Sequence, residues 1–195
     1  MKKILLCGVG GQGTILAANI LAEAALASGQ EVKVSEIHGM AQRGGAVSTM
    51  IAVGHDVASM VIGEGEADIV IAFDKLEALR ALPSLKRSGT LIVNDDLIKP
   101  ASVLTGKAQL PDDVDGLLFQ ADALVVPAEA TAREAGSPKS ANVVLLGAAA
   151  DVLGLSAEVL QEAVRSCVPP KTVEANERAF QAGRRFAEEQ GRDVR

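Results

Sequence analysis

Short apolar runs, each followed by glycine, asparagine or another turn-forming residue, recur along the first two thirds of the chain. Runs of four to six apolar residues without polar alternation are typical of strands that are buried on both faces of a parallel sheet. One further segment alternates apolar and polar residues, as a strand with one covered face does. Together these segments predict six strands, at residues 4–7, 31–37, 46–53, 68–73, 90–94 and 123–127.

Helical patterns fill most of the intervals. Residues 14–28 are rich in alanine and leucine, and so few polar positions predict a helix that is buried on most of its surface. Gly29 is expected to end it as a C-cap glycine. A second helix is predicted over 75–86, interrupted near Pro83, whereas the prolines, glycine and aspartates of 97–120 predict loop and edge structure.

From residue 139 the pattern is almost entirely helical. Three helices are predicted there, at 142–153, 157–167 and 170–190, and Ser156 is placed to cap the second one. Because strands and helices alternate over the first 95 residues, we expect βαβ units and a mostly parallel sheet. The expectation is a single α/β, Rossmann-like, three-layer domain over 1–195, with a sheet-forming part at 1–127 and a helical part at 139–190.

Composition narrows the function. With 195 residues, 48% hydrophobic and 23% charged, the chain has the balance of a soluble globular protein. A net charge of −6, four Phe and no Trp or Tyr argue against nucleic-acid binding, which uses basic patches and stacking rings. There is no run of about 20 apolar residues that could span a membrane, and the apolar start is too short for an export signal. We therefore expect a cytoplasmic protein.

The sharpest local motif is a glycine loop between the first predicted strand and the first predicted helix. Gly8, Gly10 and Gly13 have G-x-G-x-x-G spacing. Such glycines allow a tight turn and let a phosphate approach the backbone at the positive end of a helix. The candidate binding residues here are Gly8, Gly10, Gly11, Gln12, Gly13 and Thr14. The motif is also compatible with a ligand-free turn, or with an NAD(P) site in which Glu36 binds the ribose.

A second polar loop precedes the third predicted strand. Its candidate binding residues are Gln42, Arg43, Gly44 and Gly45. An arginine forks onto phosphate or carboxylate oxygens, and a Gly-Gly pair exposes backbone amides to the same anion. Both loops should lie beyond the carboxyl ends of their strands, where doubly wound folds bind ligands, which favours a phosphate-bearing ligand. His38 is more simply explained as a solvated loop residue.

No catalytic constellation is apparent. Only two histidines and two cysteines are present, which excludes a disulfide framework and a complete four-thiolate cluster within this chain. Cys7 lies in a predicted strand, where a thiol is usually inert packing. Asp95 and Asp96 are expected to start a turn rather than to bind a metal ion. We assign neither a catalytic residue nor a metal ligand to the chain.

Four longer motifs occur in a fixed order: GVGGQG (8–13), SEIHGMAQRGG (35–45), ANVVLLGA (141–148) and VPPKTVEANERAFQAG (168–183). In this order they resemble the gamma-type domain of 2-oxoacid:ferredoxin oxidoreductases, and in particular the small-subunit branch that serves indolepyruvate. The resemblance covers almost the whole chain. It implies membership of a complex that decarboxylates an aryl 2-oxoacid oxidatively, forms an acyl-CoA and reduces ferredoxin.

The resemblance also implies a division of labour. A large alpha subunit would carry thiamine diphosphate and the 4Fe-4S clusters, while this chain would handle coenzyme A and assembly. Separately, the apolar composition leaves more apolar surface than one domain needs to bury, which predicts a contact with the partner around Met40 and Arg43 and a homodimer when the chain is isolated. The alternatives are a subunit for pyruvate or 2-oxoglutarate, a purely structural subunit, and a free-standing NAD(P)-dependent oxidoreductase. Against the last, the helical remainder of about 55 residues is short for a separate catalytic domain.

Overall fold

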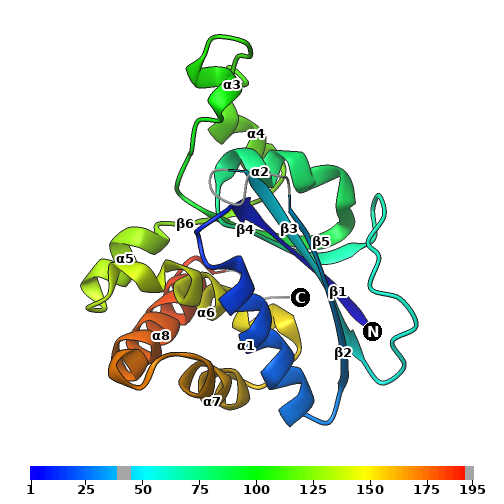
Figure 1. Ribbon diagram of the computed structural model, residues 1–195, viewed down its shortest axis with the longest axis vertical. Coiled ribbons are helices and arrows are strands. Elements are labelled where there is room, and N and C mark those ends of the chain that lie inside the picture. The colour runs from blue at the N-terminus through cyan, green and yellow to red at the C-terminus, as the bar shows by residue number, and fades with distance from the viewer. Residues whose placement is uncertain (39–44, 192–195) are drawn as a thin grey trace.

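The computed structural model describes residues 1–38 and 45–191, and in it six strands form one sheet with the order β2-β3-β1-β4-β5-β6 (Figure 1). The strands are β1 (Lys2–Val9), β2 (Glu31–His38), β3 (Ala46–Gly54), β4 (Ala67–Ala72), β5 (Leu85–Asn94) and β6 (Leu124–Val126). β1, β4, β5 and β6 pair in parallel, and β3 pairs antiparallel with both β1 and β2. The prediction of a mostly parallel sheet is confirmed.

β3 is antiparallel because no helix separates it from β2. A parallel pair needs a crossover of a dozen or more residues, and the link between β2 and β3 is shorter than that. The two strands therefore form a hairpin, in which Glu31 lies opposite Gly54 and His38 lies opposite Val47. As a result β2 runs in the same direction as β1, and the loops that follow β1 and β2 leave the same edge of the sheet.

Helices cover both faces of the sheet, giving three layers (Figure 1). The helices are α1 (Thr14–Ala27), α2 (Lys75–Ala81), α3 (Ala101–Leu104), α4 (Val114–Gln120), α5 (Ala128–Glu134), α6 (Ala141–Leu153), α7 (Ala157–Cys167) and α8 (Val173–Glu189). The face of the sheet that carries Ile4 and Leu6 packs against α1, α5, α6, α7 and α8. The opposite face, with Leu5 and Cys7, packs against α2 and α4. None of the helices in the described ranges is long and apolar enough to cross a membrane.

Two glycines set the distance between α6 and α8. A Cβ atom on Gly147 would lie 2.0 Å from the Phe180 carbonyl oxygen, and one on Gly183 would lie 2.0 Å from the Val144 carbonyl oxygen. The helix backbones therefore touch at this crossing, and the Phe180 side chain beside it is fully buried.

Two elements that the sequence pattern predicts in the middle of the chain are wrong. The helix expected over 75–86 ends at Ala81, because Pro83 lies in a 3-10 turn (Leu82–Ser84) and β5 already begins at Leu85. The segment 97–120, expected to be loop and edge structure, contains α3 and α4. Asp113 is the N-cap residue of α4, and its carboxylate accepts a hydrogen bond from the Gly116 amide, so an aspartate expected in a loop is a helix cap. α5 was not predicted.

The contact between α6 and α8 gives a stability prediction. Gly183→Ala should lower the free energy of unfolding by roughly 2 kcal/mol, because the added methyl group forces two packed backbones apart. Urea denaturation followed by circular dichroism measures this change. Gly63→Ala is the matched control, because its new Cβ would lie 3.5 Å from the nearest atom, and its midpoint should stay close to that of the wild type. Equal midpoints for both variants would contradict the packing argument.

Candidate functional site

The glycine loop joins β1 to α1, and its positions require glycine for different physical reasons. A Cβ on Gly8 would lie 2.8 Å from Cβ of Phe73, and one on Gly13 would lie 2.6 Å from Nδ2 of Asn142. Gly11 and Gly13 also have positive φ angles of 107° and 88°, which residues with a side chain rarely adopt. At Gly11 an added Cβ would meet nothing within 4 Å, so this part of the backbone faces open space.

The side chain of Gln12 fixes the loop to the sheet. Its Oε1 accepts a hydrogen bond from the Val9 amide at 2.7 Å, and its Nε2 donates to the Phe73 carbonyl oxygen at 2.9 Å. The amide group thus connects the carboxyl ends of β1 and β4, which are neighbours in the sheet but lie far apart in sequence. We assign this side chain a positioning role, distinct from the ligand contact expected from the motif.

Gly45, the described residue of the second candidate loop, lies against the glycine loop at the sheet edge. The Gly10 amide donates to the Gly45 carbonyl oxygen at 2.9 Å, so this hydrogen bond holds the start of β3 against the glycine loop. Gln42, Arg43 and Gly44 lie outside the described residues, as does Met40.

Two pockets flank the glycine loop, and both include Gly11. The first, of about 430 Å³, is lined by Gly10, Gly11, Gly13, Thr14, Ile15, Glu36 and Val47. The second, of about 480 Å³, is lined by Gly11, Gln12, Phe73, Asn94, Glu129, Pro138, Lys139, Ala141 and Leu145. The second lies at the carboxyl ends of β1, β4 and β5, where the crossover helices diverge to opposite faces of the sheet. Doubly wound folds place their ligands at such a crevice.

The first pocket combines a helix start with one carboxylate. Gly13 is the N-cap residue of α1 and has no side chain to satisfy the first amides, and the first turn of α1 carries no acidic residue. A helix start of this kind favours an anion. Glu36 enters the pocket from β2, and its carboxylate can accept hydrogen bonds from hydroxyl groups but repels phosphate.

The second pocket contains a lysine that the sequence analysis missed. Lys139 lies two residues before α6, whose N-cap residue Ser140 makes no side-chain cap hydrogen bond. Asn94 is held by its own contacts, donating to the Phe73 carbonyl oxygen at 3.2 Å and accepting from the Ala128 amide at 3.3 Å. Lys139 and Glu129 both line this pocket together with Gly11, so it carries one positive and one negative side chain. The Ser-Pro-Lys sequence just before a long apolar helix was the signal that could have indicated it.

Asn142 ties α6 to the same loop. Its Nδ2 donates to the Gly13 carbonyl oxygen at 3.3 Å, although the two residues are separated by most of the chain. The starts of α1 and α6 therefore converge on the glycine loop. This contact also went unpredicted, because nothing local in the sequence indicates it.

The other side chains considered as nucleophile or metal ligand, Cys7, Asp95 and Asp96, are buried or bound to neighbouring protein groups. Burial raises the pKa of the Cys7 thiol, and the carboxylates of Glu77 and Asp74 raise it further, which makes it a poor nucleophile. The Asp95 carboxylate pairs with Lys75 at 2.5 Å, and the Asp96 side chain accepts a hydrogen bond from the Leu97 amide within a turn. Over residues 1–38 and 45–191, no cluster of three His, Cys, Asp or Glu side chains could hold a metal ion.

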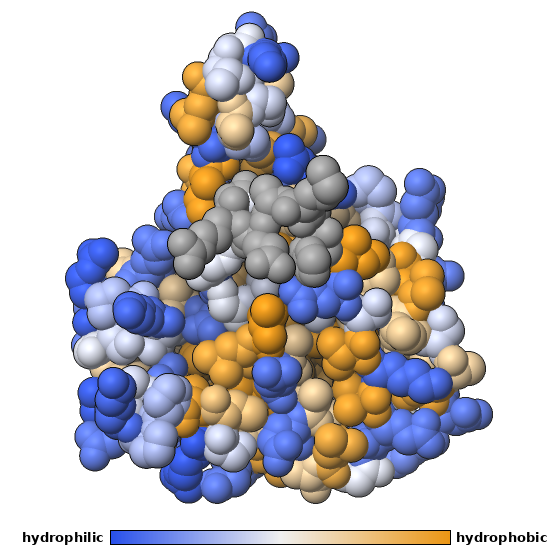
Figure 2. Space-filling model, viewed as in Figure 1, coloured by the Kyte–Doolittle hydropathy of each residue, from blue (hydrophilic) through white to orange (hydrophobic). Residues whose placement is uncertain are grey.

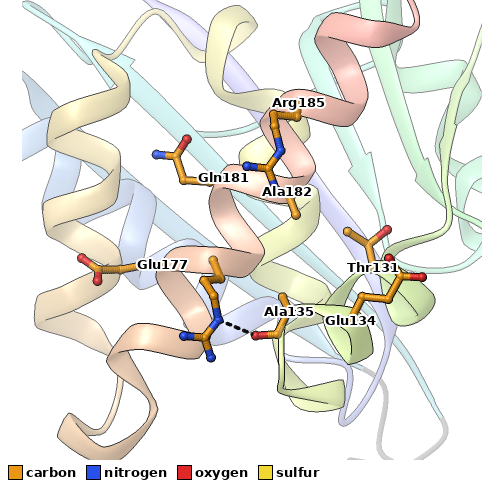
Figure 3. Close-up of a pocket in the computed structure, with 8 residues that line it drawn as sticks. Thr131, Glu134, Ala135, Glu177, Gln181, Ala182 and Arg185 are labelled. Carbon is orange, nitrogen blue, oxygen red and sulfur yellow. Dashed lines mark hydrogen bonds between the residues drawn. The ribbon is translucent and has the colours of Figure 1, made fainter.

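A further pocket, of about 480 Å³, lies between α5 and α8 (Figure 3). Three of its polar side chains are bound to neighbouring protein groups. Arg178 Nε donates to the Ala135 carbonyl oxygen at 2.9 Å, and Gln181 donates to Gln161 at 2.6 Å. Glu177 is paired with Arg165. None of its lining residues belongs to the glycine loop, so we place the candidate site at the sheet edge instead.

Comparison with known proteins agrees with this geometry. The family model for pyruvate ferredoxin/flavodoxin oxidoreductase matches residues 3–186. The chain belongs to this family. Indolepyruvate oxidoreductase subunit IorB of Thermococcus kodakarensis is 41% identical over 193 residues, covering 95% of this chain and 96% of that protein. Subunit IorB of Methanothermobacter thermautotrophicus is 42% identical over 186 residues, covering 92% of this chain and 94% of that protein.

Solved structures give the same result for the fold. The gamma subunit of a keto/oxoacid ferredoxin oxidoreductase from Geobacter sulfurreducens has a TM-score of 0.72 at 30% identity, covering 97% of this chain and 99% of that one. The resemblance inferred from the four motifs is therefore confirmed. The alternative of a free-standing NAD(P)-dependent oxidoreductase finds no support among these family members, although Glu36 does line the first pocket.

The positioning role of Gln12 can be tested by changing one atom of its side chain. Gln12→Glu keeps an acceptor for the Val9 amide but replaces the donor to the Phe73 carbonyl oxygen with a second oxygen. Because the two oxygens then repel each other, the variant should lower the free energy of unfolding by about 1–3 kcal/mol. Thermal or urea unfolding measures the change. Gln109→Glu, at an exposed position, makes the same chemical change and should have little effect. Similar stability in the two variants would show that the amide bridge does not hold the loop.

Proposed function

We propose that this chain is the small subunit of an indolepyruvate oxidoreductase complex that converts an aryl 2-oxoacid and coenzyme A to an acyl-CoA and carbon dioxide while reducing ferredoxin. The observation that carries the proposal is the near-full-length match, at about 41% identity, to subunits named for indolepyruvate. Family membership makes the chain a subunit of an oxidoreductase assembled with larger partners. We place this complex in the cytoplasm.

The redox and decarboxylation chemistry is assigned to the large subunit. A 4Fe-4S cluster needs four thiolates, and this chain has two cysteines, one of them buried within β1. In this proposal the partner holds thiamine diphosphate, which supplies the decarboxylation chemistry, and the clusters that pass electrons to ferredoxin. Residues 1–195 then act together as one gamma-type domain that carries no catalytic residue of its own.

Coenzyme A is the ligand that best fits the sheet edge, because its phosphates require anion-binding groups. We assign phosphate contacts to Gly10, Gly11, Gly13 and Thr14 and to the loop that includes Gln42, Arg43, Gly44 and Gly45. The open backbone at Gly11 and the ammonium group of Lys139 support phosphate binding on the side of the second pocket. Gly8 and Gln12 hold the loop in place, and the Glu36 carboxylate suits a hydroxyl group of the ligand.

Reconstitution tests the function directly. The purified chain alone should show no oxidation of indolepyruvate with a viologen dye, because it lacks the thiamine and cluster chemistry. Adding the purified large subunit should give activity that depends on indolepyruvate, coenzyme A and both subunits. The large subunit alone, and reactions with pyruvate or 2-oxoglutarate, are the controls. Turnover by the isolated small chain, or no gain when the two are mixed, would contradict the proposal.

A further inference from the structure

We call residues 95–120 the arm. It begins where β5 ends and contains α3 and α4. α4 packs against α2 through the buried Val114 and Leu118, and the part with α3 stands away from the body of the protein at the top of Figure 1. Because β5 is parallel to β1, the arm leaves the same edge of the sheet as the glycine loop.

The base of the arm is firmly fixed. The buried Asp74 carboxylate accepts hydrogen bonds from the Leu76 amide at 2.9 Å and from the Ile98 amide at 2.5 Å, so one side chain both caps α2 and holds the start of the arm. The Lys75 ammonium group bridges Asp95 at 2.5 Å and Asp115 at 2.8 Å. Although desolvation lowers the pKa of Lys75, hydrogen bonds to these two carboxylates raise it overall. The arm therefore projects in a direction set by its base.

Four large apolar side chains are exposed along the arm. Phe119 is 85% exposed and Leu104 is 71% exposed, and Ile98 and Leu117 are exposed as well. Figure 2 shows apolar patches among polar ones on this part of the molecule. The chain has only four Phe and no Trp or Tyr, so an aromatic ring left in solvent is conspicuous. Aromatic side chains that anchor an interface are typically presented in this way, with polar residues around them.

Charge decides what kind of partner fits. The arm holds five aspartates and two lysines, in a chain with a net charge of −6. Asp95 and Asp115 both pair with Lys75, so five negative and three positive charges leave the arm and this lysine with a net charge of −2. A second copy of the arm, nucleic acid or an anionic membrane would meet like charge. The charged residues are Asp95, Asp96, Lys99, Lys107, Asp112, Asp113 and Asp115. The surface that covers the arm should therefore be apolar at its centre and basic at its rim.

We propose that the arm is the docking element for the large subunit, with Phe119 and Leu104 as its apolar anchors. This inference rests on the proposed function, which requires a large partner. A subunit seated on the arm lies beside the sheet edge that carries the two pockets, so docking there brings the partner's cofactors toward the ligand held by the glycine loop. It differs from the contact expected around Met40 and Arg43, which lies outside the described residues.

Binding of the purified large subunit tests the proposal. Phe119→Ser should weaken its affinity by about tenfold or more, measured by biolayer interferometry with the small chain immobilised. Because Phe119 is exposed, the variant should keep the wild-type circular dichroism spectrum and unfolding midpoint. The matched control is Leu26→Ser, which removes an apolar side chain that is 58% exposed on α1. This control should bind as the wild type does.

A charge-reversal variant provides an independent measurement. Asp112→Lys should weaken binding at about 50 mM salt, and the difference from wild type should shrink at about 500 mM salt, because screening removes the attraction to a basic rim. Equal affinities for wild type and Phe119→Ser, or a loss confined to Leu26→Ser, would overturn the docking proposal and leave the proposed function standing. Failure of the wild type to bind the large subunit would overturn both. Self-association abolished by Phe119→Ser would identify a second copy as the occupant and refute the choice of partner.

Discussion

The side-chain amide of Gln12 connects two strands at the point on which the candidate site depends. It accepts a hydrogen bond from β1 and donates one to the end of β4, so the glycine loop cannot move independently of the sheet. Gly13 then allows Asn142 to approach and donate to its carbonyl oxygen, which joins the starts of α1 and α6 to the same loop. The two pockets, which share Gly11, keep their shape only while this loop is fixed.

The sheet topology explains why the chemistry gathers at one edge. The β2–β3 hairpin makes β2 parallel to β1, and the Gly10 amide holds Gly45 against the glycine loop. On the other side, the ends of β4 and β5 bring Phe73 and Asn94 to the second pocket. Behind the site, the contact between α6 and α8 at Gly147 and Gly183 lets both helices pack closely, which supports the start of α6 and with it Lys139. Docking of a partner on the arm would close the same edge from outside.

The sequence predicted well those features that depend on neighbouring residues. The six strands, α1 with its end at Gly29, and the cap at Ser156 all follow from patterns within a few residues of one another. The glycine spacing likewise indicated the position of the loop, and the four motifs together indicated the family. The predictions failed where the outcome depended on distant partners. Asp113 caps α4 inside a segment whose sequence is typical of a loop. Pro83 lies in the 3-10 turn that follows α2, and β5 begins two residues after it. The roles of Gln12, Asn142 and Lys139 require knowing which strand and helix ends converge, and no local pattern carries that information.

The central claim is that this sheet edge binds coenzyme A within the assembled complex. Hydrogen–deuterium exchange of the reconstituted complex, with and without coenzyme A and read by mass spectrometry, tests it most directly. We predict slower exchange in peptides that cover residues 9–16 and 138–145, with no change in those that cover residues 173–185 of the α5–α8 pocket. Protection that is absent from the glycine loop and appears only in the α5–α8 pocket, or only in the large subunit, would contradict the account.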